Sequence, residues 1–149
     1  MPQISNDLEY VGFWTRVAAS LIDSLLLMLV ILPPLVMIYG WAYFDSTAFI
    51  QGPADLLLSW VLPILAVLLF WIKRQATPGK ELLGARIVDA QSLGVASPRQ
   101  LVIRYLGYYL SAIPLGLGLF WVAFDPRKQG WHDKLASTLV VRRIEPKNA

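Results

Sequence analysis

No lysine or arginine occurs between Val17 and Ile72, although the whole chain of 149 residues contains 13 of them. Hydrophobic residues make up 56% of the chain and charged residues only 15%, whereas a soluble domain has about 45–50% apolar and about 25% charged residues. A long segment without cations is typical of sequence that lies inside a membrane. We therefore expect a membrane protein, much of whose surface is solvated by lipid.

The first apolar segment is long enough to cross a bilayer as a helix. Asp23 is the only charged residue from Val17 to Tyr39, and at 1.5 Å per residue this span reaches about 34 Å. We predict a membrane helix over residues 15–39. Pro33 and Pro34 remove two backbone donors, so a kink, or a break into a shorter helix and an interfacial segment, is expected near its far end.

A second membrane helix is predicted over residues 56–73, where an apolar run about 25 Å long ends at Lys73 and Arg74. The connection between the two helices carries no cation, whereas the loop of residues 74–99 carries several. By the positive-inside rule this loop is cytoplasmic. The two helices then form a hairpin that is entered and left from the cytoplasm, with the N-terminus on that side.

The third apolar region, residues 100–124, is flanked by basic residues and by two candidate strands. The β-branched segments 85–90 and 138–143 are expected to pair as a small cytoplasmic β-ribbon. A single crossing would put the basic tail, residues 125–149, outside, and two crossings need about 40 residues. We favour a re-entrant hairpin, broken at the proline and glycines of residues 111–118; the alternative is one kinked span with the tail outside. The predicted fold class is an all-α membrane protein with this possible ribbon, as a single domain that spans the whole chain.

Arg16 and Asp23 lie seven residues apart, on almost the same face of the first predicted helix. A carboxylate two turns deep costs about 2.5–3.5 kcal/mol on membrane insertion scales unless it is paired, solvated or protonated. The separation of about 10 Å along the axis is too long for a compact ion pair, so another segment or water must compensate Asp23. Arg104, in the third apolar region, is a candidate partner. Asp23 is then either an ion or proton site or a structural tether.

A charged edge follows the third apolar region, from Asp125 to Lys134. Its basic residues need no special explanation, because they meet lipid phosphates. Asp125 and Asp133 are expected to bind neighbouring arginines or to cap a helix. His132, the single histidine of the chain, is predicted to be exposed at the interface and structural, although an exposed imidazole could titrate near neutral pH.

The tetrapeptide Thr77-Pro78-Gly79-Lys80 resembles the end of a phosphate loop. A phosphate loop needs a serine or threonine after its lysine, and Glu81 stands there, so no nucleotide site is predicted. We interpret the segment as a tight turn after the second helix. Pro78 and Gly79 set the geometry of this turn, and Lys80 faces lipid phosphate.

Composition narrows the classes of ligand and function. The chain has no cysteine and one histidine, so we expect neither thiolate metal sites nor histidine clusters. No cofactor is expected. No nucleophile, base and orienting group occur at a recognisable spacing, so an enzyme is not expected. The net charge of +3 is small and the cations flank apolar segments. We therefore expect contact with the lipid bilayer and anionic headgroups, and not with nucleic acid.

The predicted helices are too few to enclose a pathway alone. Transport would therefore require a homo-oligomer or a membrane protein partner. Gly107 and Ser111, four residues apart in the third region, would allow another helix to approach closely. We interpret this face as the place where such a partner would bind.

Three blocks of the sequence resemble a known family; they are residues 12–23, 77–89 and 125–141, the last including Gln129 and His132. The chain resembles the RDD family of bacterial membrane proteins, which is named for one arginine and two aspartates. The resemblance maps the arginine onto Arg16 and the first aspartate onto Asp23. The second is Asp125 or Asp133, with Asp125 narrowly favoured. Trp131, where a smaller apolar residue is commoner, is a modest departure from the family pattern.

The resemblance implies a multi-pass protein of the bacterial inner membrane. The family is assigned to transport mainly by inference, and some members are proposed to be sodium/proton antiporters. One hypothesis is therefore transport of a cation or small solute, with Asp23 as the buried acid and Arg16 or Arg104 setting its charge state. The other is a non-transporting scaffold that recruits a protein partner or anionic lipid, in which Asp23 only locks the helices together.

Overall fold

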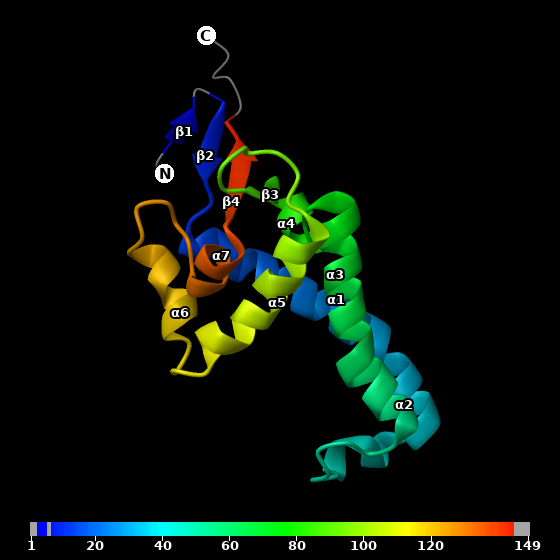
Figure 1. Ribbon diagram of the computed structural model, residues 1–149. Helices are drawn as coiled ribbons and strands as arrows, with labels where there is room; N and C mark the ends of the chain where they lie inside the picture. Colours follow the sequence, from blue (N-terminus) through cyan, green and yellow to red (C-terminus); the bar gives the residue numbers. More distant parts are fainter. Residues whose placement is uncertain (1–2, 6, 145–149) are drawn as a thin grey trace.

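The chain is mostly helical, and two of its helices are long and apolar enough to cross a membrane. The computed structural model describes residues 3–5 and 7–144. The first long helix is α1, Phe13–Tyr39. The second covers Pro53–Arg74 and consists of α2 (Pro53–Asp55), η2 (Leu56–Val61) and α3 (Leu62–Arg74). Both predicted apolar helices are therefore confirmed, and they lie side by side over part of their length (Figure 1).

Prolines have different local effects in the two long helices. α1 continues through Pro33 and Pro34 to Tyr39, so the break, one of the two predicted alternatives, does not occur. Helices in apolar surroundings tolerate proline when local adjustments satisfy the freed carbonyl groups. In the second helix, the wide π-helical turn of η2 precedes Pro63. Proline lacks the N–H that a regular helix uses, and a π-helical turn accommodates that loss.

A four-stranded antiparallel sheet lies at one end of the two long helices (Figure 1). Its strands, in the spatial order β1-β2-β4-β3, are β1 (Gln3–Ser5), β2 (Leu8–Tyr10), β3 (Ala85–Asp89) and β4 (Thr138–Arg143). β3 and β4 pair from Ala85 with Arg142 to Asp89 with Thr138, which confirms the predicted ribbon. The sheet is larger than predicted, because β2 pairs with β4 and β1 with β2. The fold is therefore not all-α but helical with a small sheet.

The main apolar core lies between the sheet, α3 and α5 (Pro98–Ala112). Its largest members, each at most 2% exposed, are Val11, Trp71, Ile87, Leu101 and Val140. Side chains alternate along a strand, so Val88, Leu139 and Val141 form a second cluster on the other face of the sheet. A strand buried on both faces cannot slip in register without exposing apolar side chains, which fixes the sheet against the helices.

The third apolar region folds as two short helical parts that meet at a sharp bend. α5 is followed by α6 (Leu117–Phe120) and η3 (Trp121–Ala123), at an angle of 111°. Leu115 and Gly116, between them, have φ of 54° and 75°, the left-handed region in which helices commonly end. The break therefore occurs within the predicted residues. β3 precedes α5, and α7 (Trp131–Ala136) leads into β4, so both ends of the third region return to the same sheet.

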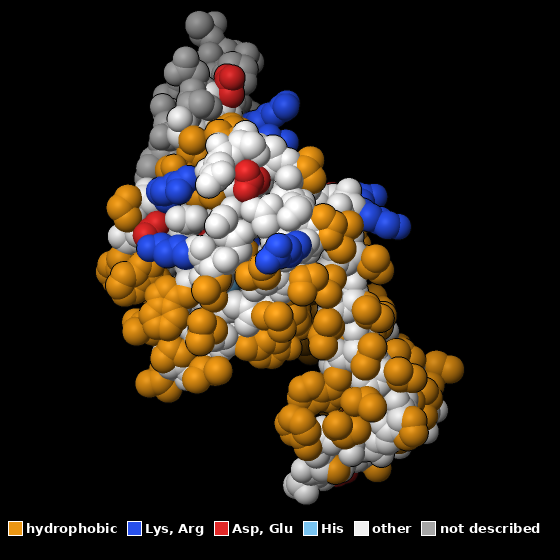
Figure 2. Space-filling view, viewed as in Figure 1, with side chains coloured by type: hydrophobic (Ala, Val, Ile, Leu, Met, Phe, Trp, Pro, Cys, Tyr) orange, Lys and Arg blue, Asp and Glu red, His pale blue; other side chains and the backbone are white. Residues whose placement is uncertain are grey.

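Apolar and charged side chains gather on different parts of the surface (Figure 2). Large apolar side chains are exposed along both long helices and at the bend of the third region; Met37 is 87% exposed and Leu115 is 96% exposed. In the view of Figure 2, lysine and arginine side chains lie toward the end that carries the sheet. Exposed apolar helices next to a basic end fit a membrane protein.

Candidate functional site

A buried cluster of charges joins α1, α5 and α7. Asp133 has a fully buried side chain and pairs with Arg16 Nη1 at 2.7 Å. Its other oxygen pairs with Arg104, which is itself fully buried. We call Arg16, Arg104 and Asp133 the charge cluster. Because each member belongs to a different helix, the cluster ties three elements together.

Uncharged groups add further hydrogen bonds to the charge cluster. Arg16 donates from Nη2 to the Lys128 carbonyl at 2.5 Å, and Arg104 donates to Thr138 Oγ1 at 2.9 Å. Burial acts to raise the pKa of Asp133, but the charges of Arg104 and Arg16 hold it well below its usual range. Asp133 is therefore ionised at neutral pH, and its charge is shared between two cations.

Asp23 is bonded to the loop that follows the second long helix. Its Oδ2 accepts a hydrogen bond from Thr77 Oγ1 at 2.5 Å, and its Oδ1 accepts one from the Gly79 amide at 2.7 Å. The prediction that another segment compensates Asp23 is confirmed. The predicted partner, Arg104, is wrong, because α5 packs on α7 and presents Arg104 to Asp133.

The segment that binds Asp23 is the start of α4 (Pro78–Leu82), and not a simple tight turn. α4 lies so close to α1 that a Cβ atom on Gly79 would come within 2.2 Å of the Ala19 carbonyl oxygen. The Thr77 hydroxyl bonds Asp23 and does not cap its own helix. An acid that accepts bonds from the first turn of a helix is also favoured by the helix dipole. Asp23 and Gly79 together dock α4 on α1.

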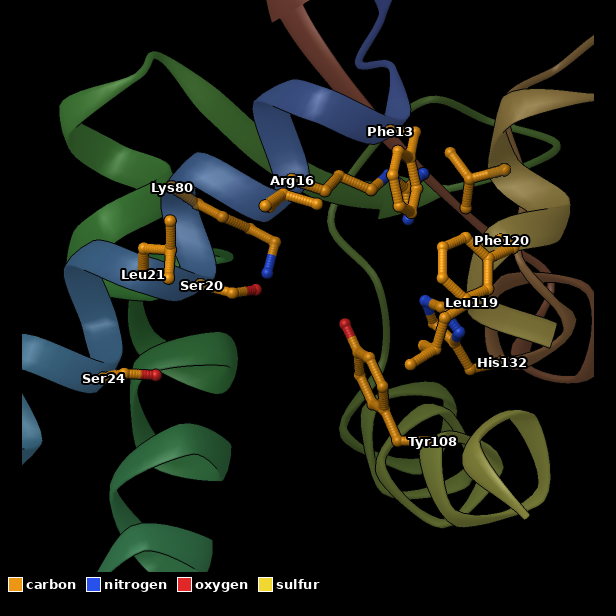
Figure 3. Close-up of a pocket in the computed structure, with 12 residues that line it drawn as sticks. Phe13, Arg16, Ser20, Leu21, Ser24, Lys80, Tyr108, Leu119, Phe120 and His132 are labelled. Carbon is orange, nitrogen blue, oxygen red and sulfur yellow. The ribbon is translucent and has the colours of Figure 1, made fainter. Parts of the chain in front are cut away.

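A cavity of about 300 Å³ lies between α1, α4 and the third region (Figure 3). Its polar lining is Arg16, Ser20, Ser24, Lys80, Tyr108 and His132. The Lys80 side chain extends into this cavity (Figure 3), and only 6% of the residue is exposed. The prediction of a surface turn with an exposed Lys80 is therefore wrong, and burial lowers the pKa of its ammonium group.

His132 is buried beside the same cavity, so its predicted exposure is wrong. Its ring stacks on Tyr108 with the ring centroids 4.0 Å apart, and its Nδ1 lies 3.4 Å from Ser111 Oγ. Burial lowers the pKa of His132 to about 3, although the charge of Asp133 acts to raise it. The imidazole is thus neutral at physiological pH, and the suggestion that it titrates near neutrality is also wrong.

Asp125 and Gln129 hold the connection between the third region and α7. Asp125 pairs with Lys134 Nζ at 2.7 Å and accepts a bond from the Gln129 amide at 3.2 Å. Gln129 Nε2 donates to the Thr138 carbonyl at 2.9 Å. These bonds position the start of α7 and of β4, and none of them reaches Arg16.

The two candidates for the second family aspartate therefore have different surroundings. Asp133 pairs with Arg16 across 117 residues of sequence and accepts a bond from the Gly130 amide at 2.9 Å. Asp125 bonds within its own loop and with α7. The geometry groups Arg16 with Asp133, the less favoured candidate of the two. Within residues 3–5 and 7–144, no group of three acidic or histidine side chains is placed to hold a metal ion.

The small residues of α5 pack inside the chain. A Cβ atom on Gly107 would lie 2.9 Å from His132 Cα, and Ser111 Oγ accepts a bond from the His132 amide at 3.2 Å. This close approach lets α7 lie against α5. The face that the sequence suggested for a partner is therefore occupied by α7.

A second polar cluster, at the far end of the long helices, was missed by the sequence analysis. Asp55 is buried and accepts bonds from Tyr43 OH at 2.8 Å, the Gln51 amide at 2.9 Å and Ser59 Oγ at 2.8 Å. Tyr43 belongs to η1 (Trp41–Asp45). An acid in the first turn of an apolar helix, with serine four residues later, is the sequence signal that could have indicated this fixed turn.

Comparison with known proteins gives the family. A segment of 73 residues, 49% of this chain, is 36% identical to an uncharacterized protein of Rickettsia prowazekii (strain Madrid E) and covers 40% of it. A segment of 69 residues, 46% of this chain, is 41% identical to an uncharacterized protein of Bacillus subtilis (strain 168) and covers 44% of it. The chain thus spans less than half the length of these relatives, and no solved structure matches it. The sequence profile of the RDD family matches residues 10–137, nearly the whole chain, and the chain therefore belongs to the RDD family.

Proposed function

We propose that the chain is a multi-pass protein of the bacterial inner membrane, with the sheet and the charge cluster on the cytoplasmic side. α1 and Pro53–Arg74 cross the bilayer as a hairpin, and the third region enters from the cytoplasm and returns to it. The length and apolar character of the two helices support this topology, as does the gathering of cations near the sheet (Figure 2). The pairing of β3 with β4 supports the re-entrant third region, because it holds both ends of that region together.

Single cysteines test this topology, because the chain has no cysteine of its own. Ser46, Ser92 and Arg143 are exposed and lie between the long helices, between β3 and α5, and at the end of β4. We expect a membrane-impermeant maleimide to label Ser46→Cys in intact cells. Ser92→Cys and Arg143→Cys should react only in inside-out vesicles. Labelling of Arg143→Cys in intact cells would mean that the third region crosses completely.

In this membrane the chain acts as a scaffold that binds anionic lipid at its cytoplasmic side, with Asp23 as a structural lock. The observation that carries this function is the bonding of Asp23, whose two oxygens each accept a short hydrogen bond from one loop. An incoming cation would have to displace one of these donors. The geometry favours a tether over a cation site.

Transport of a small solute is the second candidate function, because the cavity continues a polar stripe along α1. Ser20 and Ser24 follow Arg16 at intervals of four residues, and all three line the cavity. Polar residues that face a cavity within an apolar helix commonly mark solute or ion pathways. In this candidate Asp23, which lines a neighbouring pocket and not this cavity, is the ion or proton site.

The substitution Asp23→Asn separates the two candidates. Asparagine keeps one oxygen acceptor but removes the charge, so we expect the free energy of unfolding in detergent to fall by about 1–3 kcal/mol. Vesicles of phosphatidylcholine and phosphatidylglycerol should show no pH-driven sodium flux above the protein-free level with either form. Asp45→Asn, at an exposed acid between the long helices, is the control and should leave stability unchanged. Sodium flux by the wild type that Asp23→Asn abolishes without loss of stability would favour transport.

A further inference from the structure

Lys80 is a buried lysine whose side-chain nitrogen has no anionic partner within bonding distance. It lies in α4, and its ammonium group extends into the cavity beside α1 (Figure 3). Among the residues that the structure describes, no hydrogen bond or ion pair reaches this group. Lysine is rarely buried unless it is paired, because a charge loses favourable interactions with water on burial.

The charges around Lys80 do not balance. The carboxylate of Asp133 is shared by the two arginines of the charge cluster. Both oxygens of Asp23 accept bonds from uncharged donors at the start of α4. His132 adds no charge at neutral pH, because burial lowers its pKa. With Lys80 protonated, three cations face two carboxylates, and one positive charge at the cavity has no compensating acid.

Two hydroxyl groups face the same space as Lys80. Tyr108 OH and Ser20 Oγ both point into the cavity (Figure 3). Tyr108 OH accepts a bond from Arg104 at 3.4 Å, so its own proton remains available to donate. An ammonium group with hydroxyl donors is a set that binds phosphate oxygens. The cavity volume of about 300 Å³ is roughly ten times the 30 Å³ that a water molecule occupies in the liquid, so a phosphate group has ample room.

The rest of the cavity wall is apolar. Phe13, Leu119 and Phe120 line it across from Lys80 and Ser20 (Figure 3). Ser24 and Leu21, which also line it, are exposed on the flank of α1, so the cavity opens toward the apolar part of the surface. This combination suits a phosphate ester that carries an apolar chain, with the phosphate at Lys80 and the chain along the aromatic side chains.

We propose that the cavity binds a phosphate group, with Lys80 as its ion-pair partner and with Tyr108 and Ser20 as hydrogen-bond donors. The phosphate is either the headgroup of an anionic lipid or free phosphate, which share this chemistry. A lipid headgroup as the ligand rests on the proposed scaffold function, for which this cavity would be the lipid-binding site. The site itself rests on the unpaired cation, the two hydroxyl groups and the cavity.

The test measures binding to the full chain purified in detergent. Inorganic phosphate and short-chain phosphatidylglycerol are added separately, and the dissociation constant is taken from the rise in unfolding temperature. We expect saturable binding of at least one probe, and a dissociation constant about tenfold higher or more for Lys80→Gln, since a charge-assisted bond is lost. Lys73→Gln, at an exposed lysine at the end of α3, is the matched control and should bind as the wild type does.

The two probes separate the two sources of phosphate. Binding of phosphatidylglycerol alone assigns the site to a lipid headgroup, and binding of both assigns it to phosphate as such. Absence of saturable binding to the wild type overturns the proposal. An equal loss in Lys80→Gln and Lys73→Gln also overturns it, because it would indicate diffuse surface attraction.

A second variant keeps the test decisive if Lys80→Gln does not fold. Tyr108→Phe retains the ring that stacks on His132 and removes the hydroxyl donor. We expect Tyr108→Phe to weaken phosphate binding several-fold. Unchanged binding in this variant overturns the proposal that Tyr108 is a hydrogen-bond donor to the phosphate. The proposed scaffold function can fail separately, and that failure would appear as an inverted topology or as sodium flux. Neither result would change Lys80-dependent phosphate binding measured in detergent.

Discussion

Asp133→Asn is expected to lower the free energy of unfolding by about 3–5 kcal/mol, because it removes one partner from a buried ion-pair network. Asparagine keeps the shape of the side chain but removes the charge that Arg16 and Arg104 share. Arg104 would remain fully buried without an acid beside it, and an unpaired buried charge is more costly than a weakened hydrogen bond. Thermal or denaturant unfolding of the detergent-purified chain measures this loss.

Glu81→Gln is the matched control for Asp133→Asn. Arg74 and Glu81 pair at 3.4 Å, but 63% and 36% of their side chains are exposed, and exposed pairs contribute about 0–1 kcal/mol. Equal stability of the two variants would mean that the charge cluster does not hold α1, α5 and α7 together.

The dependence of stability on pH provides an independent measurement of the interaction of Asp133 with the two arginines. The pKa of Asp133 in the folded chain lies below its value in the unfolded chain. Its contribution to stability is therefore complete above about pH 4 and is lost as the pH falls further. The difference in stability between the wild type and Asp133→Asn should shrink over that acidic range.

The elements that could be predicted from the sequence are those with a strong local signal. The two long helices follow from continuous apolar segments, and the pairing of β3 with β4 follows from β-branched segments on the two basic flanks of the third region. β1 and β2 were missed because each has three residues, which is too short for a clear alternation of apolar and polar side chains. They form strands because β4 offers an edge with which β2 can pair.

The partners of the buried charges could not be predicted from the sequence. Helical spacing indicates that Asp23 needs a partner from another segment, but it does not indicate which segment lies opposite. The sequence suggests a pair of Asp23 and Arg104 because both lie in apolar segments. The structure separates them, since α4 packs on α1 at Asp23 and α7 packs on α5 at Arg104. Asp133, in a short polar segment, is an alternative partner for Arg104. Only the packing of the helices determines whether Arg104 pairs with Asp23 or with Asp133.

The burial of Lys80 likewise could not be predicted from the residues next to it in the sequence. Pro78 and Gly79 are typical of an exposed turn, and a lysine next to them reads as a surface residue. Gly79, however, allows α4 to approach the backbone of α1. This approach carries the adjacent Lys80 into the cavity. The residue that makes the turn look flexible is thus the one that permits the close contact.

The substitution Gly79→Ala is therefore expected to destabilise the chain by about 3 kcal/mol or more, at the upper end of the effects of overpacking. The new Cβ atom would lie 2.2 Å from the Ala19 carbonyl oxygen and 3.0 Å from Asp23 Cγ. Backbone atoms of α1 cannot move aside as a flexible side chain can, so α4 must shift away. That shift breaks both hydrogen bonds of Asp23, and unfolding in detergent measures the combined loss.

A second readout distinguishes displacement of α4 from general destabilisation. Lys80 follows Gly79 in α4, so Gly79→Ala should also weaken phosphate binding when it is measured at a temperature where the variant is still folded. Gly94→Ala is the control, because Gly94 is exposed and its nearest contact would be the flexible Ser92 side chain at 3.3 Å. If Gly79→Ala were as stable as Gly94→Ala, the contact between α1 and α4 could not be what holds Lys80 inside the cavity. The contact between α1 and α4 thus links the two hydrogen bonds of Asp23 to the position of Lys80 in the cavity.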